Sequence, residues 1–268
     1  MSRRNGPLTQ TQALGPYPSL VGGDGPPLVY LTGLMPKTGV TELRAMHTAS
    51  LAPYARRRTV HLVNRRPELP REMTIAQLCD ELAAAMRERF GEPVDVLGLS
   101  TGGSIAQQLA ADHPEVVRRL ALVSTGHRLS PETRAEMRRI AARIRRGATR
   151  QALAMAAGAL APGAWRLPAG LAASLLGPRW MTERDLADLA ATIELEDMFA
   201  LEHCARPIRA PTLVVGGTRD RYYPVAMFEE TVALIPGARL DLRPDQGHIT
   251  VTGKPEVHAA ILDHLDGR

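Results

Sequence analysis

The chain has 268 residues, of which 44% are hydrophobic, so it can bury the core of one large domain or of a domain with an insertion. Its formal net charge of +5 comes almost entirely from arginine, because Lys37 and Lys254 are the only lysines. Aromatic residues make up only 4% of the chain, and no nucleic-acid motif is present. These features argue against a nucleic-acid partner and favour a basic surface in contact with solvent.

No apolar run is long enough to span a bilayer, and no signal-like apolar segment follows the basic residues at the N-terminus. We therefore expect a cytoplasmic protein with a small-molecule partner and with no membrane or nucleic-acid partner. Cys79 and Cys204 lie far apart and lack the spacing of metal ligands, so we expect free thiols in a reducing compartment. The sequence leaves the oligomeric state open.

The first half of the chain alternates strand-like and helix-like segments. Residues 1–25 are rich in glycine, proline and polar residues, which predicts an extended or poorly ordered entry. Beyond them we expect strands at 28–31, 59–63, 94–99 and 117–123, and helices at 41–54 and 75–90, the second with Thr74 as its N-cap. Such alternation predicts a mostly parallel α/β sheet flanked by helices.

The alternation stops after residue 130. From 131 to 203 the pattern is helical throughout, and breaks are expected at Pro162, Pro168 and Pro178. An α/β pattern resumes with strands at 211–216 and 239–242 and a terminal helix at 255–265. We therefore predict a core (residues 1–130 and 206–268) and an inserted helical cap (residues 131–205). The alternative is that these helices simply extend the core.

The segment Gly98-Leu99-Ser100-Thr101-Gly102 follows a predicted strand and precedes a helix-like stretch of small residues. This context is typical of a nucleophile elbow, in which the flanking glycines let strand and helix approach closely around a strained serine. The turn exposes the hydroxyl of Ser100 and leaves amides near a helix N-terminus that can bind an oxyanion. A glycine-rich turn without chemistry is the alternative interpretation.

A serine nucleophile needs a base, and in a parallel sheet such a base comes from a loop at the carboxyl end of a strand. His248 follows the last predicted strand and is the best placed of the eight histidines. His127, which follows the strand after the elbow, is the second candidate. Four others are excluded by their predicted positions within a strand or on helices: His61, His113, His258 and His264.

The base in turn needs a carboxylate that fixes its tautomer. Asp220 follows the strand at 211–216 and is favoured for this role. Asp245 is nearer to His248 in sequence, but side chains so close along one loop often point apart. No carboxylate directly follows the strand at 117–123, which removes another common location for the acid. A turn-forming role for Asp220 is the alternative.

The chain order Ser100, Asp220, His248 is the order found in α/β-hydrolases. Three motifs carry the likeness: the elbow, the glycine-containing loop that ends at Asp220, and Gly247-His248 before a final helix. From about Pro26 onward the sequence resembles the α/β-hydrolase superfamily, and more narrowly its capped esterase, lactonase and cofactor-free haloperoxidase-like members. The resemblance implies an α/β-hydrolase fold, with a mostly parallel central sheet flanked by helices and an inserted helical cap.

The resemblance also implies an oxyanion hole made by the backbone amides of Thr101 and Leu34. Many relatives carry His-Gly in the second of these loops, where this chain has Thr32-Gly33, and the change leaves a backbone donor in place. Relatives that open epoxides or displace halide resemble this pattern with aspartate as the nucleophile. Ser100 therefore argues against those activities.

These observations predict a carboxylesterase-like serine hydrolase that cleaves an ester, lactone or thioester of a small molecule through an acyl-enzyme. One alternative is a non-hydrolytic reaction of the same triad in small-molecule biosynthesis (C–C cleavage, elimination, cyclisation or acyl transfer). A binding protein on a hydrolase scaffold is another. We expect no cofactor and no metal, because the reaction needs neither and no close ligand spacing is present. The substrate-binding candidates are Thr32, Gly33, Trp165, Trp180 and Met198.

Overall fold

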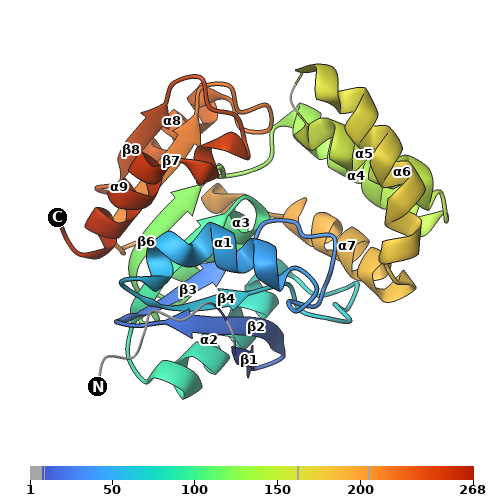
Figure 1. Ribbon diagram of the computed structural model, residues 1–268. Helices are drawn as coiled ribbons and strands as arrows, with labels where there is room; N and C mark the ends of the chain where they lie inside the picture. The colour runs from blue at the N-terminus through green and yellow to red at the C-terminus, as the bar shows by residue number, and fades with distance from the viewer. Residues whose placement is uncertain (1–7, 9, 162, 205) are drawn as a thin grey trace.

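The computed structural model describes residues 8, 10–161, 163–204 and 206–268. Within this part of the chain, an eight-stranded sheet has the order β1-β2-β4-β3-β5-β6-β7-β8 (Figure 1). Its strands are β1 (Gln10–Leu14), β2 (Tyr17–Gly23), β3 (Pro27–Leu31), β4 (Thr59–Val63), β5 (Val94–Leu99), β6 (Val117–Val123), β7 (Thr212–Gly217) and β8 (Arg239–Arg243). All neighbouring strands from β4 to β8 pair in parallel, which confirms the predicted, mostly parallel sheet.

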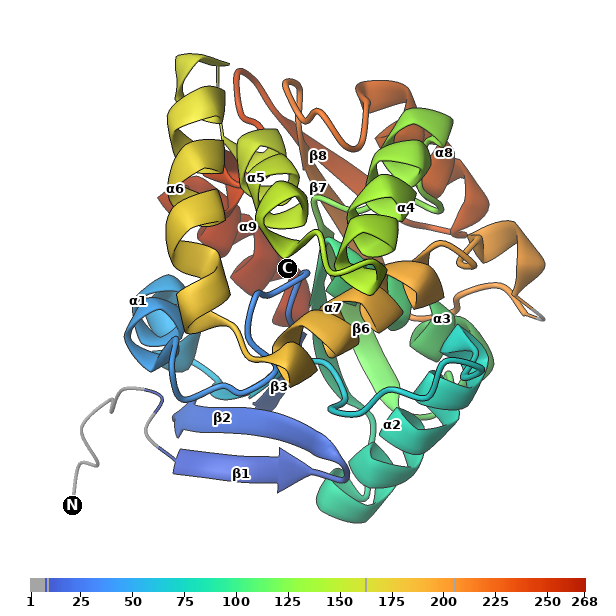
Figure 2. The ribbon, with the colours of Figure 1, turned by 90° about the vertical axis from the view of Figure 1, so that its right-hand side faces the viewer.

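Helices cover both faces of the sheet, as Figure 2 shows. One face carries α1 (Arg44–Ala55) and α9 (Pro255–Leu265), and the other carries α2 (Ile75–Phe90), α3 (Thr101–Asp112) and α8 (Val225–Leu234). The predicted capping of α2 is confirmed, because the Thr74 side chain accepts from the Gln77 amide and the Gln77 side chain accepts from the Thr74 amide. Each face of the sheet buries its own apolar cluster.

Residues 10–23 correct the expectation of an extended or poorly ordered entry over residues 1–25, of which 1–7 and 9 lie outside the described residues. Residues 10–23 form the β1–β2 hairpin, which turns through Gly15 at φ 57°. β2 pairs antiparallel with β4, and the buried Tyr17 donates its hydroxyl to Leu78 O at 3.0 Å. Glycine here serves the tight turn and the end of β2, while Tyr17 and Leu20 anchor the hairpin to the core. The composition of this segment therefore did not predict its two strands.

The chain between β6 and β7 forms α4 (Pro131–Arg145), α5 (Thr149–Leu160), α6 (Arg166–Trp180) and α7 (Glu183–Glu196). We call these helices the helical insertion. α4, α5 and α6 group away from the sheet, and α7 runs between this group and the core (Figure 1). Pro168 and Pro178 lie within α6, so the breaks predicted there are wrong. Pro168 occupies the first turn, where a missing N–H leaves no hydrogen bond unmade. Pro162 lies outside the described residues.

None of the described helices combines the length and the apolar character that crossing a membrane requires. Among the described residues, Cys79 is buried, Cys204 is partly buried, and both are free thiols, as the sequence predicts. The cytoplasmic location stays a prediction.

A buried polar network joins α7 to the loop after β3. Lys37 Nζ donates to Asp185 Oδ2 at 2.9 Å and to Trp180 O at 2.7 Å, and the Thr38 amide donates to Asp185 Oδ1 at 3.0 Å. The Lys37 and Asp185 side chains are only 7% and 8% exposed. Burial alone would raise the pKa of Asp185, but hydrogen bonds from Thr38, Lys37 and Thr182 outweigh it and hold that pKa well below its usual range.

We expect Asp185→Asn to lower the free energy of unfolding by about 3–5 kcal/mol, because it leaves the Lys37 ammonium buried without its counter-ion. Urea denaturation measures the loss. Arg184→Gln is the matched control, since the neighbouring Arg184 pairs with Glu68 at the surface, where both side chains are more than 60% exposed. That exposed pair contributes about 0–1 kcal/mol. Equal losses in the two variants would contradict a structural role for the buried pair.

Candidate active site

Ser100 lies where β5 becomes α3. Its backbone has φ 51° and ψ −122°, a region that residues with side chains rarely adopt. The Ser100 amide donates to Val123 O at 3.0 Å, and Ser100 O accepts from the Gly103 amide at 2.6 Å. Both sides of the residue are therefore held by backbone hydrogen bonds. Such a conformation costs about 1–3 kcal/mol and persists only where its surroundings impose it.

Two glycines allow this turn. A Cβ on Gly98 would lie 2.6 Å from Gly103 Cα, and a Cβ on Gly102 would lie 2.5 Å from Thr32 O. Real Cβ atoms do not approach other atoms so closely. The first turn of α3 therefore approaches both β5 and the loop after β3 more closely than a side chain would permit.

The structure brings Ser100, His248 and Asp220 into one hydrogen-bonded chain. His248 Nε2 lies 3.0 Å from Ser100 Oγ, and His248 Nδ1 lies 2.9 Å from Asp220 Oδ2. Because a carboxylate can only accept, Nδ1 carries the proton, and Nε2 accepts from the serine hydroxyl. The side chains of His248 and Asp220 are 9% and 0% exposed, so the chain is largely shielded from water.

Neighbouring groups fix the acid and the base. Asp220 Oδ1 also accepts from the amides of Tyr222 at 2.9 Å and Tyr223 at 3.1 Å. The Tyr223 ring stacks on the His248 imidazole with centroids 5.9 Å apart. The plane of the Tyr222 ring makes an angle of 65° with the plane of the same imidazole. Ser124 Oγ donates to His248 O at 2.8 Å. The orientation of the imidazole is therefore set by the protein, without a ligand.

The second candidates from the sequence lie elsewhere. Asp245 is exposed, and its carboxylate pairs with Arg219 at 2.6 Å. His127 is buried, and its Nε2 lies 3.3 Å from a Glu202 oxygen and 3.5 Å from a Glu230 oxygen. Within the described residues, neither side chain forms a hydrogen bond to Ser100 or His248.

The loop after β3 lies against the elbow. A Cβ on Gly33 would be 3.3 Å from Ser100 Cβ, and the next residue, Leu34, lines a small cavity together with Thr101. Thr101 is the first residue of α3, where an amide has no acceptor within the helix. Neither the Leu34 amide nor the Thr101 amide donates to a backbone acceptor within the described chain. Two such donors beside a serine hydroxyl can bind a negatively charged oxygen.

Asn64, which directly follows β4, holds this loop in shape. Its side-chain amide donates to Lys37 O at 2.8 Å and to Thr38 O at 3.0 Å. The Thr32 hydroxyl donates to Asn64 Oδ1 at 3.0 Å. Thr32, at the position where many relatives carry histidine, thus connects the loop to Asn64 through a neutral hydrogen bond.

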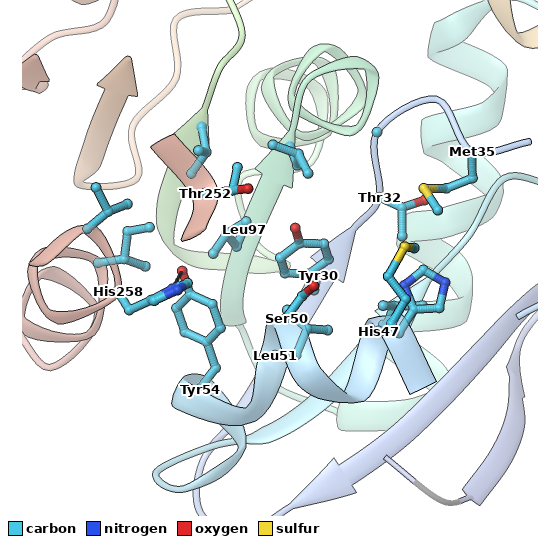
Figure 3. Close-up of a pocket in the computed structure, with 17 residues that line it drawn as sticks. Tyr30, Thr32, Met35, His47, Ser50, Leu51, Tyr54, Leu97, Thr252 and His258 are labelled. Carbon is cyan, nitrogen blue, oxygen red and sulfur yellow. Dashed lines mark hydrogen bonds between the residues drawn. The ribbon is translucent and has the colours of Figure 1, made fainter. Parts of the chain in front are cut away.

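Thr32 and Gly33 line two cavities. The larger, of about 110 Å³, lies between the sheet, α1 and α9 (Figure 3). Its lining is mainly apolar, and it includes the polar groups of Tyr30, His47 and Ser50. Burial lowers the pKa of His47, so this imidazole is neutral at pH 7. The smaller cavity, of about 30 Å³, is lined in part by Leu34, Thr101, Ile105, Thr192 and Leu195.

The other three substrate-binding candidates lie on the surface. Trp165, Trp180 and Met198 are 69%, 45% and 54% exposed, and none of them lines either cavity. Lys37 Nζ lies 5.6 Å from the centroid of the Trp180 ring. A role of these three side chains in substrate binding stays a prediction.

Sequence reasoning missed Glu196, the last residue of α7. Glu196 is 5% exposed and accepts hydrogen bonds from Thr101 Oγ1 at 2.7 Å and Ser104 Oγ at 3.0 Å. Burial raises its pKa above the usual range, although these hydroxyl groups act in the opposite direction. A glutamate at the end of a predicted helix normally faces water. No sequence signal therefore marks its burial.

Three other residues were not predicted to have a role. Ser124 holds the backbone of His248, Asn64 holds the loop after β3, and Tyr223 donates its amide to Asp220. Ser124 and Asn64 each directly follow a buried parallel strand, β6 and β4. Polar residues at such positions gather at one edge of the sheet, and this signal could have drawn attention to both.

The α/β hydrolase fold model matches residues 59–255, which is most of the chain. The chain belongs to the α/β hydrolase family. This finding confirms the resemblance and the fold class that the sequence predicts, and it identifies the chain as an enzyme of that family, whose named relatives include hydrolases.

Two relatives and one solved structure illustrate the similarity. The chain is 24% identical to a pyrrolizixenacetamide deacetylase of Xenorhabdus hominickii over 72% of each protein. It is 32% identical to polyketide synthase ThaQ of Burkholderia thailandensis over 92% of this chain, which corresponds to 12% of that synthase. The enol-lactonase of Burkholderia xenovorans has the same fold, with a TM-score of 0.72 and 22% identity over 97% of this chain and 100% of that one.

We expect Gly102→Ala to slow covalent labelling by a fluorophosphonate about 10²–10³-fold, because the new Cβ displaces the Thr32 carbonyl and with it the loop that carries the Leu34 amide. Intact-mass time courses give the labelling rate. Gly253→Ala is the control, since a Cβ there meets nothing within 4 Å. Similar labelling rates in the two variants would contradict the importance of this close approach.

Proposed function

We propose that the protein is a serine hydrolase that cleaves an ester, lactone or thioester bond of a small substrate. The hydrogen-bonded chain from Ser100 through His248 to Asp220 carries this proposal, with donor–acceptor distances of 3.0 and 2.9 Å. Family membership and similarity to a deacetylase support hydrolytic chemistry at this chain.

The reaction has two halves. His248 Nε2 takes the Ser100 proton as Oγ attacks the substrate carbonyl, and the imidazolium then returns that proton to the departing alcohol or thiol. In the second half His248 takes a proton from water, which attacks the acyl carbon, and Ser100 Oγ leaves and regains a proton. Each half passes through a tetrahedral oxyanion that the Leu34 and Thr101 amides stabilise.

Asp220 stabilises the imidazolium in both halves. Its carboxylate is buried and already accepts from two backbone amides, so it neither rotates nor exchanges with water during the reaction. With one oxygen 2.9 Å from Nδ1, it keeps His248 in the tautomer whose Nε2 accepts a proton. In the serine protease triad, loss of this tautomer control costs about 10⁴ in kcat.

The larger cavity is the proposed acyl site. Leu99, the residue before the nucleophile, lines it together with Thr32 and Gly33, so an acyl group attached to Ser100 extends toward the cavity. A volume of about 110 Å³ suits a short aliphatic group. The neutral His47 and the Tyr30 hydroxyl offer hydrogen bonds to an uncharged polar substituent.

Acyl transfer is the second candidate function. Similarity to a segment of a polyketide synthase favours a substrate delivered as a thioester and an acyl-enzyme released to an alcohol or amine. The same three side chains serve that reaction, because His248 activates either acceptor as it would activate water. Analysis of products in the presence of alcohols and amines separates transfer from hydrolysis.

The proposed nucleophile is tested with a fluorophosphonate probe and intact mass. We expect a stoichiometric adduct on the wild type and none on Ser100→Ala, with an Asp220→Asn variant labelling about 10⁴-fold more slowly because the imidazole takes the wrong tautomer. Hydrolysis of an ester and lactone panel should follow the same order. A folded wild type that forms no adduct and cleaves no ester would contradict the proposed function.

The acyl site is tested with Ser50→Trp, which fills the mouth of the larger cavity from an exposed position on α1. We expect kcat/KM for a p-nitrophenyl butyrate to fall at least about tenfold, since each methylene in such a site contributes about 1–3 kcal/mol. The acetate ester has no chain to place there and serves as the internal control. Equal losses for both esters would locate the acyl group elsewhere.

A further inference from the structure

The helical insertion places a buried carboxylate beside the active site. Glu196 Oε2 accepts from Thr101 Oγ1 at 2.7 Å, and Glu196 Oε1 accepts from Ser104 Oγ at 3.0 Å and from the Tyr223 hydroxyl at 3.4 Å. These three partners are neutral hydroxyl groups, so dipoles rather than a cation hold the carboxylate. Only 5% of Glu196 is exposed.

Its partners belong to different parts of the proposed machinery. Thr101 carries one of the two amides that face the oxyanion. Tyr223 stacks its ring on His248 and donates its amide to Asp220 at 3.1 Å. Glu196 thus contacts Thr101, a residue of the proposed oxyanion hole, and Tyr223, the residue whose ring packs on His248.

We propose that Glu196 is a positioning residue of this active site, which orients Thr101 beside the oxyanion and Tyr223 beside His248. This inference rests on the proposed serine hydrolase function and adds a second carboxylate to it. Because α7 supplies Glu196, the helical insertion contributes a residue to the proposed catalytic machinery.

The surroundings of Glu196 support this role. Burial, the largest influence, raises its pKa, while hydrogen bonds from Thr101, Ser104 and Tyr223 lower it. A buried carboxylate that loses one of these donors is destabilised, so the positions of Thr101 and Tyr223 are coupled to that of Glu196.

The next residue along the chain, Asp197, is engaged by other groups. Its carboxylate oxygens lie 3.3 Å from Arg134 Nε and 2.7 Å from an Arg138 guanidinium nitrogen, both on α4. These pairs neutralise Asp197 locally. Glu196 is therefore the carboxylate of this segment that accepts hydrogen bonds from residues of the site.

The test is the steady-state kinetics of ester hydrolysis by Glu196→Gln, which keeps the shape of the side chain but replaces one accepting oxygen with an NH₂ donor. Thr101 or Tyr223 then loses its acceptor, so we expect kcat to fall about tenfold. KM should stay within about twofold, because neither Thr101 nor Tyr223 lines the proposed acyl site.

Two further variants serve as controls. Glu196→Asp keeps two accepting oxygens, so it should recover part of the kcat that Glu196→Gln loses. Glu194→Gln removes an exposed carboxylate from the same helix, where Glu194 pairs with Arg145 at 2.6 Å, and should leave kcat and KM unchanged. Circular dichroism confirms that each variant is folded.

The outcomes distinguish this inference from the proposed function. If wild type forms no fluorophosphonate adduct, the proposed function fails and this inference with it. If wild type reacts and Glu196→Gln keeps the wild-type kcat, or loses no more than Glu196→Asp does, the inference is wrong. A kcat that falls in Glu196→Gln at unchanged KM and recovers in Glu196→Asp supports it.

Discussion

The whole site depends on how closely the first turn of α3 approaches the end of β3. Gly102 permits that approach, since a Cβ there would lie 2.5 Å or less from the Leu31 and Thr32 carbonyl oxygens, and Gly98 permits the matching approach of α3 to β5. Ser100 adopts φ 51° at this junction, and the loop that carries Leu34 lies beside it, since a Cβ on Gly33 would be 3.3 Å from Ser100 Cβ. The strained serine and the proposed oxyanion donors therefore depend on the same close packing.

Hydrogen bonds of buried polar groups fix the loop, the base and the helix that surround Ser100. Asn64 fixes the loop after β3, Ser124 fixes the backbone of His248, and the Lys37–Asp185 pair joins α7 to the same loop. A buried polar group without a hydrogen-bond partner destabilises the folded state. A shift that breaks one of these hydrogen bonds therefore raises the free energy of the protein. Preorganised donors of this kind stabilise charge that develops during a reaction without first having to reorient.

Much of this architecture could be predicted from local patterns. The bounds of α2 followed from its apolar stripe and from Thr74, and the chain order of Ser100, Asp220 and His248 followed from where predicted strands end. The β1–β2 hairpin was not predicted, because it is stabilised by pairing with β4, which local composition does not encode. The burial of Glu196 was not predicted for a similar reason, since it depends on where α7 packs.

The most direct measurement is a crystal structure of the protein after reaction with a small alkyl fluorophosphonate. We expect phosphorus bonded to Ser100 Oγ, with the phosphoryl oxygen about 2.7–3.1 Å from both the Leu34 and Thr101 amides. His248 should still be hydrogen-bonded to Asp220. Phosphorus on another residue, or a phosphoryl oxygen that faces away from both amides, would show that this elbow and this loop do not form one catalytic site.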